Sequence, residues 1–241
     1  MHPILVYGDS LTWGIIPNTR QRLPFHQRWP GVLENALIAV GRNVRILEDC
    51  LNGRRTVWED PFKPGRNGVH GLAQRMEIHS PLSLVILMLG TNDFQFSHPY
   101  NTAWTAGQGI ATLVHEIRRA PIEPGMPMPP ILVIAPPPIR SAPMSGSFLS
   151  GSFQRPVALK FANAEAQSQG LADAYQEVCA TLHCHFFDAA TVTPSSAADG
   201  VHLDADQHLL LGKALESVVS HILAAKIEER NANTPQLPVS Q

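Results

Sequence analysis

Five short runs of β-branched and aliphatic residues recur along the chain, and longer amphipathic stretches alternate with them. The runs cover residues 4–7, 44–47, 84–89, 131–135 and 185–187, and the stretches cover residues 30–40, 66–78, 105–119, 157–182 and 204–227. The apolar runs are continuous, which is typical of strands buried on both faces of a parallel sheet. The alternation therefore predicts an α/β fold, a flavodoxin-like three-layer α/β/α sandwich with a five-stranded parallel sheet.

No feature of the sequence divides the chain into separate domains. It has 241 residues, a length at which α/β folds commonly form one unit, and it contains no internal repeat and no linker. We therefore expect a single domain over residues 1–230 and a disordered tail over residues 231–241. Two long irregular stretches, residues 17–29 and 136–156, are candidate functional or interface loops, with an idle surface excursion as the alternative.

Charge and cysteine content narrow the choice of partners. The 18 basic and 20 acidic residues give a formal net charge of -2, so the chain has no strong field for polyanions or anionic lipids. We expect no nucleic-acid partner and no membrane partner, and no apolar run reaches the roughly 18 residues of a membrane span.

Cys50, Cys179 and Cys184 lack zinc-site spacing, which favours buried thiols in a reducing compartment. With no signal-peptide pattern, this predicts a cytoplasmic location.

A serine follows the end of the first predicted strand. The strand leads into Gly8, Asp9 and Ser10, at the carboxyl edge of the sheet where open α/β folds bind ligands. Glycine permits close backbone approach, and a serine at this point can direct its hydroxyl and its amide into the crevice. A turn or a helix-capping serine is the alternative, because Asp and Ser favour turns.

Polar groups also follow the second and third predicted strands. Asn92 comes after the third strand, where a side-chain amide is a candidate donor to an oxyanion. Asn52 and Gly53 follow the second strand, and Gly53 offers a backbone N–H that a ligand can approach closely. Each motif taken alone has a simple turn as its alternative.

Asp199 and His202 stand three residues apart, before the last amphipathic stretch. This spacing lets the carboxylate reach the far nitrogen of the imidazole, so that one loop supplies a base and its orienting group. Serine needs such a base to take its proton, and the carboxylate fixes the tautomer and stabilises the imidazolium. A helix-start aspartate and a surface histidine are the alternative. The coincidence of four motifs at one sheet edge favours catalysis, and the absence of Gly-x-Ser-x-Gly disfavours an α/β-hydrolase.

The four motifs resemble the Ser, Gly, Asn and His blocks of the SGNH (GDSL-type) hydrolases, over a region from Gly8 to about Leu215. Residues 7–14 (YGDSLTWG), 88–93 (MLGTND) and 136–138 (PPP) are similar to the arylesterase/acyltransferase, perhydrolase-like subgroup. This resemblance implies a flavodoxin-like fold without a cofactor or a metal. It also implies a possible homo-oligomer, for which the two irregular stretches are the expected contacts.

The resemblance assigns a role to each motif by position. Ser10 becomes the nucleophile, His202 the general base and Asp199 its partner. The amides of Ser10 and Gly53 and the side chain of Asn92 become the oxyanion hole. The block around Gly53 is a looser match, and this leaves Asn52 as an alternative to Gly53 for the second donor.

The implied function is that of a serine esterase. It would hydrolyse short-chain acyl or aryl esters, small-molecule substrates, through an acyl-serine intermediate, with acyltransfer or perhydrolysis as further outcomes. A carbohydrate acetyl esterase (deacetylase) is the alternative enzyme, because it would use the same triad. A carbohydrate-binding or scaffold protein is the non-enzymatic alternative, which a missing triad residue would favour, and none is missing.

Several residues next to the motifs have two interpretations each. Four apolar side chains could line a small acyl pocket or pack in the core: Leu11, Trp13, Phe94 and Val201. Arg54 and Arg55 are expected to be solvated, with substrate contact as the alternative. Alternation along a strand would send His183 and His185 to one face and Cys184 to the other, so no metal site is expected there.

Overall fold

The computed structural model describes residues 1–19, 21–141 and 157–232. Its five strands form one sheet and are β1 (His2–Gly8), β2 (Val44–Cys50), β3 (Leu84–Met88), β4 (Ile131–Ala135) and β5 (His185–Asp188). The strand order is β2-β1-β3-β4-β5, and every neighbouring pair is parallel. This order is that of flavodoxin-like folds, so the predicted α/β class and five-stranded parallel sheet are confirmed.

The burial of the strands explains their continuous apolar runs. Every residue of β3 and β4 is buried, whereas the edge strands β2 and β5 keep exposed or half-buried positions. A central strand of a parallel sheet has a helical layer over each face, so both sets of its side chains need to be apolar. An edge strand is covered less completely and tolerates charged residues.

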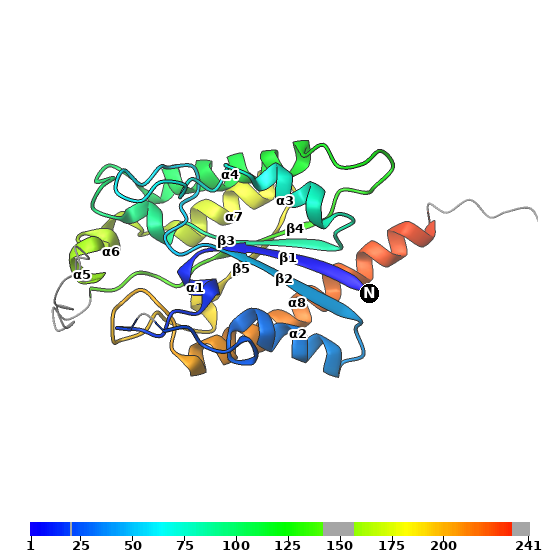
Figure 1. Cartoon of the computed structure of the whole chain (residues 1–241), viewed down its shortest axis with the longest axis horizontal. Helices are drawn as coiled ribbons and strands as arrows, with labels where there is room; N and C mark the ends of the chain where they lie inside the picture. Colours follow the sequence, from blue (N-terminus) through cyan, green and yellow to red (C-terminus); the bar gives the residue numbers. More distant parts are fainter. Residues whose placement is uncertain (20, 142–156, 233–241) are drawn as a thin grey trace, which may run out of the picture.

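Helices cover both faces of the sheet (Figure 1). On one face, α2 (Trp29–Ala39) packs against α8 (Ala205–Ala232). On the other face lie α3 (Leu72–His79), α4 (Ala103–Arg119) and α7 (Leu171–Thr181). The buried residues of α4 include Ile110, Leu113, Val114 and Ile117, the three- and four-residue spacing of one helix face. This apolar stripe holds α4 on the sheet.

The order of the strands positions the site. β1 lies between β2 and β3, so the chain leaves β1 for the strand on one side and later returns to the strand on the other side. Such a reversal opens a crevice beyond the carboxyl ends of the strands, where ligands of open α/β sheets bind. Ser10 begins the short helix α1 (Ser10–Trp13) directly after β1, and Asn92 lies in the 3-10 turn η2 (Thr91–Phe94) after β3.

The single helix predicted over residues 157–182 is wrong. This region instead forms α5 (Val157–Lys160), α6 (Ala164–Gln167) and α7. Asn163 (φ 65°) and Gly170 (φ 80°) adopt left-handed backbone conformations, which an α-helix cannot continue through. The helix predicted over residues 66–78 likewise begins only at Leu72, after a left-handed Gly71.

The two predicted irregular stretches and the predicted tail are described only in part by the structure. Residues 17–29 contain the 3-10 turn η1 (Phe25–Gln27), and η3 (Ala189–Thr191) follows β5. Residues 231 and 232 of the predicted tail belong to α8, and residues 233–241, like residues 142–156, lie outside the described part. The single-domain boundary and self-association stay predictions.

Among the described helices, none combines the length and the apolar character that crossing a bilayer requires.

Candidate active site

Ser10 occupies a tight turn between β1 and α1. Asp9 caps the helix, because its Oδ1 accepts a hydrogen bond from the Leu11 amide at 2.9 Å. Gly8 is required before this turn: a Cβ at its position would lie 2.8 Å from the Thr12 Cβ. The turn keeps Ser10 buried, with 5% of its surface exposed.

The Asp199–His202 loop is held by its own hydrogen bonds and by the segment after β4. The Ser196 amide donates to the His202 carbonyl (2.7 Å), and the Arg140 amide donates to the Gly200 carbonyl (2.9 Å). Asp199 Oδ1 accepts from the amides of Val201 (3.0 Å) and His202 (2.9 Å). Burial alone would raise the pKa of Asp199, but the hydrogen bonds and charge of His202 outweigh it and hold that pKa below its usual value. Asp199 is therefore an anion at neutral pH.

The structure brings Ser10, His202 and Asp199 into one line of contacts. His202 Nδ1 lies 2.7 Å from Asp199 Oδ2, and His202 Nε2 lies 3.1 Å from Ser10 Oγ. A proton on Nδ1, donated to the carboxylate, leaves Nε2 as an acceptor for the serine hydroxyl. The arrangement therefore has the geometry in which a histidine can deprotonate a serine.

Two backbone amides near Ser10 are candidates for binding an oxyanion. Among the described residues, neither the Ser10 nor the Gly53 amide has a hydrogen-bond acceptor. Gly53 has φ +86°, a conformation that L side chains rarely adopt, and it is buried in the turn after β2. The Asn52 carbonyl accepts a hydrogen bond from Arg66 Nε (3.0 Å), and the buried Asn52 Oδ1 has no hydrogen-bond partner in the described part of the chain. The choice between Gly53 and Asn52 stays a prediction.

Asn92 lies against the same turn. Its Nδ2 donates to Asp9 Oδ2 (2.8 Å) and to the Arg54 carbonyl (3.1 Å). Burial raises the pKa of Asp9 to about 6, and the Leu11 amide, His202 and Asn92 partly offset that rise. Both amide hydrogens of Asn92 thus have protein acceptors, and a ligand oxygen must share or replace one of them.

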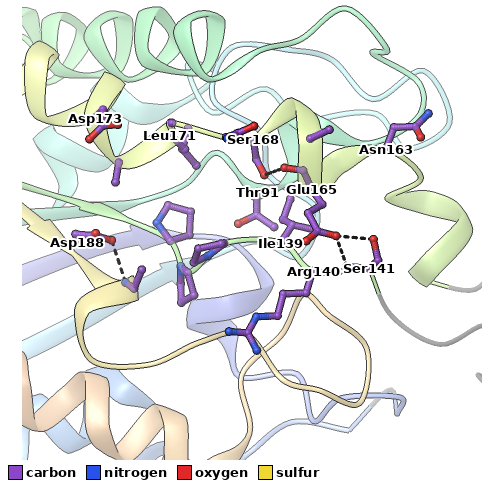
Figure 2. Close-up of a pocket in the computed structure, with 18 residues that line it drawn as sticks. Thr91, Ile139, Arg140, Ser141, Asn163, Glu165, Ser168, Leu171, Asp173 and Asp188 are labelled. Atoms are coloured by element: carbon purple, nitrogen blue, oxygen red, sulfur yellow. Dashed lines mark hydrogen bonds between the residues drawn. The ribbon is translucent and has the colours of Figure 1, made fainter.

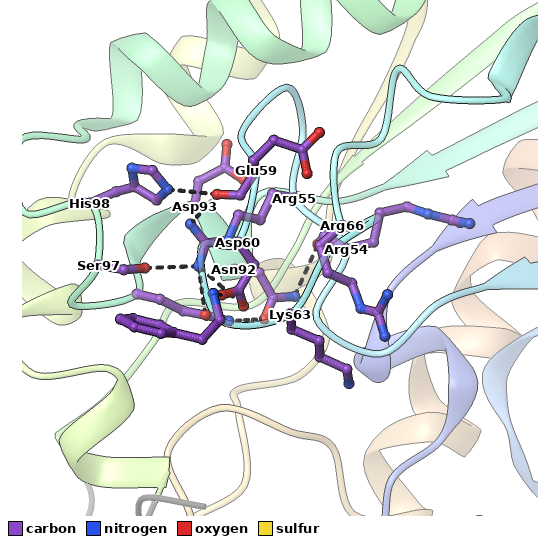
Figure 3. Close-up of polar contacts among 12 residues, drawn as sticks. Arg54, Arg55, Glu59, Asp60, Lys63, Arg66, Asn92, Asp93, Ser97 and His98 are labelled. Atoms are coloured by element: carbon purple, nitrogen blue, oxygen red, sulfur yellow. Dashed lines mark hydrogen bonds and ion pairs between the residues drawn. The ribbon is translucent and has the colours of Figure 1, made fainter.

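Arg54 and Arg55 are not solvated, and the expectation that they would be is wrong. The Arg54 guanidinium donates to the Gly8 (3.1 Å) and Asp49 (2.6 Å) carbonyls and stacks on the Tyr7 ring at 3.8 Å. Arg55 is fully buried among polar groups (Figure 3). Buried guanidinium groups need such acceptors to offset their lost hydration. Arg54 therefore joins the carboxyl ends of β1 and β2.

The four predicted pocket residues occupy two environments. Leu11, Phe94 and Val201 belong to the hydrophobic core and are at most 2% exposed. Trp13 is half-buried, and the Arg22 guanidinium carbon lies 4.6 Å from its ring centre. Trp13 is thus the member of this set whose ring reaches the surface, and its part in a pocket stays a prediction.

A cavity of about 800 Å³ lies beside this site, between the segment after β4 and the helices α6 and α7 (Figure 2). Its described lining includes Thr91, next to Asn92, and Arg140, which holds the Asp199–His202 loop. Neither Ser10 nor His202 is among the described lining residues. The cavity is therefore a neighbour of the serine and histidine and is not centred on them. In the described part of the chain, no three His, Cys, Asp or Glu side chains are grouped to hold a metal ion.

The model of the GDSL-like Lipase/Acylhydrolase family matches residues 6–210, from β1 into α8. The chain belongs to this family. The predicted resemblance to SGNH (GDSL-type) hydrolases is thus confirmed, and so is the predicted class of carboxylic ester hydrolase.

Several relatives of this GDSL-like chain are esterases. An arylesterase of Vibrio mimicus is 32% identical over 90 residues, which are 37% of this chain and 37% of that protein. A carbohydrate acetylesterase family member from Sinorhizobium meliloti superposes with a TM-score of 0.83 at 35% identity, over 93% of this chain and 100% of that chain. The M. smegmatis aryl esterase gives a TM-score of 0.81 at 32% identity, over 92% and 100%.

Sequence reasoning missed the buried polar residues that support this GDSL-like site. The sequence motifs identify Asp9 only as a turn former, although an Asp before a helix is a strong capping signal. They do not connect Gln95 or Arg55 to Asn92. The short spacing between Asn92 and Gln95 is the one local signal, because residues three apart in a helical turn can face each other.

We expect Asp93 to make the stability of the protein fall as the pH rises from about 4 to about 7. Burial raises the pKa of Asp93 from 3.8 to about 7, opposed by hydrogen bonds from the Thr56 hydroxyl and amide and by the charge of Arg55. Because the folded state then binds the proton more tightly than the unfolded state, its contribution is present below the unfolded pKa and is lost as the pH passes the folded pKa. Asp93→Asn removes this titration.

Urea unfolding at several pH values measures the effect. The free energy of unfolding of Asp93→Asn should change less between about pH 4 and pH 7 than that of the wild type. Parallel pH profiles of the two proteins would contradict the assignment.

Proposed function

We propose that the protein is a serine esterase that hydrolyses short-chain acyl or aryl esters through an acyl-Ser10 intermediate. The observation that carries this proposal is the continuous line from Ser10 Oγ to His202 Nε2 (3.1 Å) and from His202 Nδ1 to Asp199 Oδ2 (2.7 Å). Membership of an acylhydrolase family supports it. A carbohydrate-binding or scaffold role is disfavoured, because such a role leaves this arrangement without a purpose.

Acylation begins with proton transfer from Ser10 Oγ to His202 Nε2 while Oγ attacks the ester carbonyl carbon. Asp199 stays ionised and stabilises the imidazolium through its bond to Nδ1. The tetrahedral intermediate then breaks its bond to the leaving alcohol, which takes the proton from His202. Water, activated by the same nitrogen, attacks the acyl-serine and releases the carboxylic acid.

The oxyanion of both intermediates would be bound by the amides of Ser10 and Gly53 and by Asn92 Nδ2. The two amides have no acceptor among the described residues, so they can donate without losing a bond. The longer Asn92 bond, 3.1 Å to the Arg54 carbonyl, is the one that the oxyanion would share or replace. Each preorganised donor of this kind typically contributes about 10²- to 10³-fold in turnover.

A carbohydrate acetyl esterase is the second candidate, and the Sinorhizobium meliloti carbohydrate acetylesterase family member at 35% identity favours it. Both candidates use the same serine and histidine, so the leaving group distinguishes them. Comparing kcat/KM for p-nitrophenyl acetate and for acetylated sugars separates the two. Added alcohol or peroxide, with product analysis, tests whether the acyl group also passes to acceptors other than water.

We expect acetate and propionate p-nitrophenyl esters to have a higher kcat/KM than the octanoate ester. Trp13 lies three residues after Ser10 in α1, a spacing at which two side chains can lie on the same side of a helix, so its half-buried ring would narrow the space next to the nucleophile. A chain that outgrows this space clashes, whereas each methylene that fits adds only about 1–3 kcal/mol of discrimination. Trp13→Ala should therefore move the optimum to longer acyl chains.

Trp104→Ala is the matched control, because Trp104 is an exposed tryptophan of α4, 65% exposed. It should leave the chain-length profile unchanged. A wild type that prefers octanoate would refute the small acyl pocket. A stable Trp13→Ala protein with the wild-type profile would remove Trp13 from the pocket wall.

A further inference from the structure

The Asn92 side chain is held in one of two orientations that have the same shape. Turning the amide by 180° exchanges Nδ2 and Oδ1, and so exchanges a double donor for an acceptor. In the structure Nδ2 faces Asp9 and the Arg54 carbonyl, and Oδ1 accepts a hydrogen bond from Gln95 Nε2 at 2.5 Å. Asn92 is buried, so bulk water is not at hand to satisfy a turned amide.

The Gln95 side-chain amide also has two possible orientations of the same shape, and it lies behind Asn92 as seen from Ser10. Its Nε2 donates to Asn92 Oδ1, and its Oε1 accepts from Arg55 Nη2 at 2.9 Å. Gln95 is 1% exposed. Turning Gln95 would place its Nε2 against the Arg55 guanidinium and its Oε1 against the Asn92 oxygen, so the orientation of Gln95 depends on Arg55.

Arg55 has only one possible hydrogen-bonding role, because a guanidinium carries donors and no acceptor. It therefore fixes the orientation of the Gln95 amide. It is fully buried and is fixed by the Ser97 hydroxyl (2.9 Å), the Glu59 carbonyl (3.2 Å) and the Asp60 carboxylate (3.5 Å), as Figure 3 shows. Only an oxygen of Gln95 can face it. The direction of donation is thereby set from Arg55 to Gln95 and from Gln95 to Asn92.

We propose that Arg55 and Gln95 form a polarity relay that orients the Asn92 amide, with Gln95 acting as a positioning residue for the oxyanion hole. The inference rests on the proposed role of Asn92 as an oxyanion donor. The relay points Nδ2 toward the Ser10 turn before any substrate arrives. Hydrogen bonds in such a chain also polarise one another, which makes the Asn92 N–H a stronger donor.

Gln95→Glu tests the relay because it keeps the size of the side chain and changes its polarity. The new carboxylate still accepts from Arg55, but it offers only an acceptor to Asn92, so Asn92 should turn its Nδ2 away from the site. We expect kcat for a short p-nitrophenyl ester to fall about 10- to 100-fold, since one oxyanion donor is lost or weakened, with a much smaller change in KM. Gln108→Glu, at an exposed position of α4, is the matched control and should keep the wild-type kcat.

The same substitution in an Asn92→Ala background separates positioning from general damage. If Gln95 acts through Asn92, Gln95→Glu should lower kcat no further in that background. The relay is overturned if Gln95→Glu matches Gln108→Glu in kcat, or if it lowers kcat by the same factor with and without Asn92. An Asn92→Ala protein with the wild-type kcat would instead refute the proposed oxyanion role, on which the relay depends.

Gln95→Met keeps the inference testable if Gln95→Glu does not fold. Methionine has a similar length and offers no amide, so it releases the Asn92 oxygen without forcing the amide to turn. We expect a smaller loss, about 3- to 10-fold in kcat, that again disappears in the Asn92→Ala background. An unchanged kcat for Gln95→Met, or an equal loss in both backgrounds, would overturn the relay.

Discussion

Ser10→Ala should lower kcat for a short p-nitrophenyl ester by several orders of magnitude, about 10⁵-fold or more, because nucleophile and base act as one unit. The protein should stay folded. Among the described residues, Ser10 Oγ has His202 Nε2 as its one hydrogen-bond partner, so little else is lost with the hydroxyl. The remaining activity measures what the oxyanion donors and substrate binding achieve without an acyl-enzyme.

Covalent labelling locates the nucleophile independently of the kinetics. A fluorophosphonate should modify Ser10 in the wild type, as peptide mass spectrometry would show, and should not modify the Ser10→Ala protein. Ser220 is a part-buried serine of α8, and Ser220→Ala serves as the matched control. This variant should be labelled and active like the wild type. A folded Ser10→Ala protein that retains most of its activity would refute the mechanism.

His202→Ala should be about as damaging as Ser10→Ala, and the double variant should be little worse than either, since removing the base already disables the nucleophile. The loss follows because His202 Nε2 is the one described group within hydrogen-bonding distance of Ser10 Oγ that can take its proton. The measurement is kcat for a short p-nitrophenyl ester in the wild type, in each single variant and in the double variant.

Two other histidines serve as references for His202→Ala. Burial lowers the pKa of His208 to about 3, so His208 is a neutral histidine of the core. His115 is exposed on α4, and His115→Ala should keep the wild-type kcat. A folded His202→Ala protein that retains most of the wild-type kcat would contradict the assignment of His202 as the base.

The sheet and the central contacts of the site could be predicted because their signals are local. The runs that became β3 and β4 are apolar at every position, which only a doubly covered strand requires. Asp199 and His202 are three residues apart, so their contact needs only one loop. Ser10 follows β1 directly, and the sheet topology then placed it at the carboxyl edge.

The support of the site could not be predicted because its partners are scattered along the chain. Two adjacent arginines look like a solvated pair, but Arg54 finds its acceptors at Gly8 and Asp49, and Arg55 finds Gln95 about forty residues later. No periodicity links such positions. The break in the predicted helix at Asn163 was missed for a related reason, since a left-handed asparagine gives a weaker signal than a glycine.

The first and the last strand-to-helix connections of the fold each supply one half of the proposed reacting pair. Ser10 and His202 are 192 residues apart and meet only through the assembled sheet. During synthesis, a chain that has emerged as far as β4 already carries the serine but has no base to activate it. With Ser10 as the proposed nucleophile and His202 as the proposed base, we expect ester cleavage only once the fold is complete, and we expect a nascent or truncated chain to carry an inert Ser10 hydroxyl.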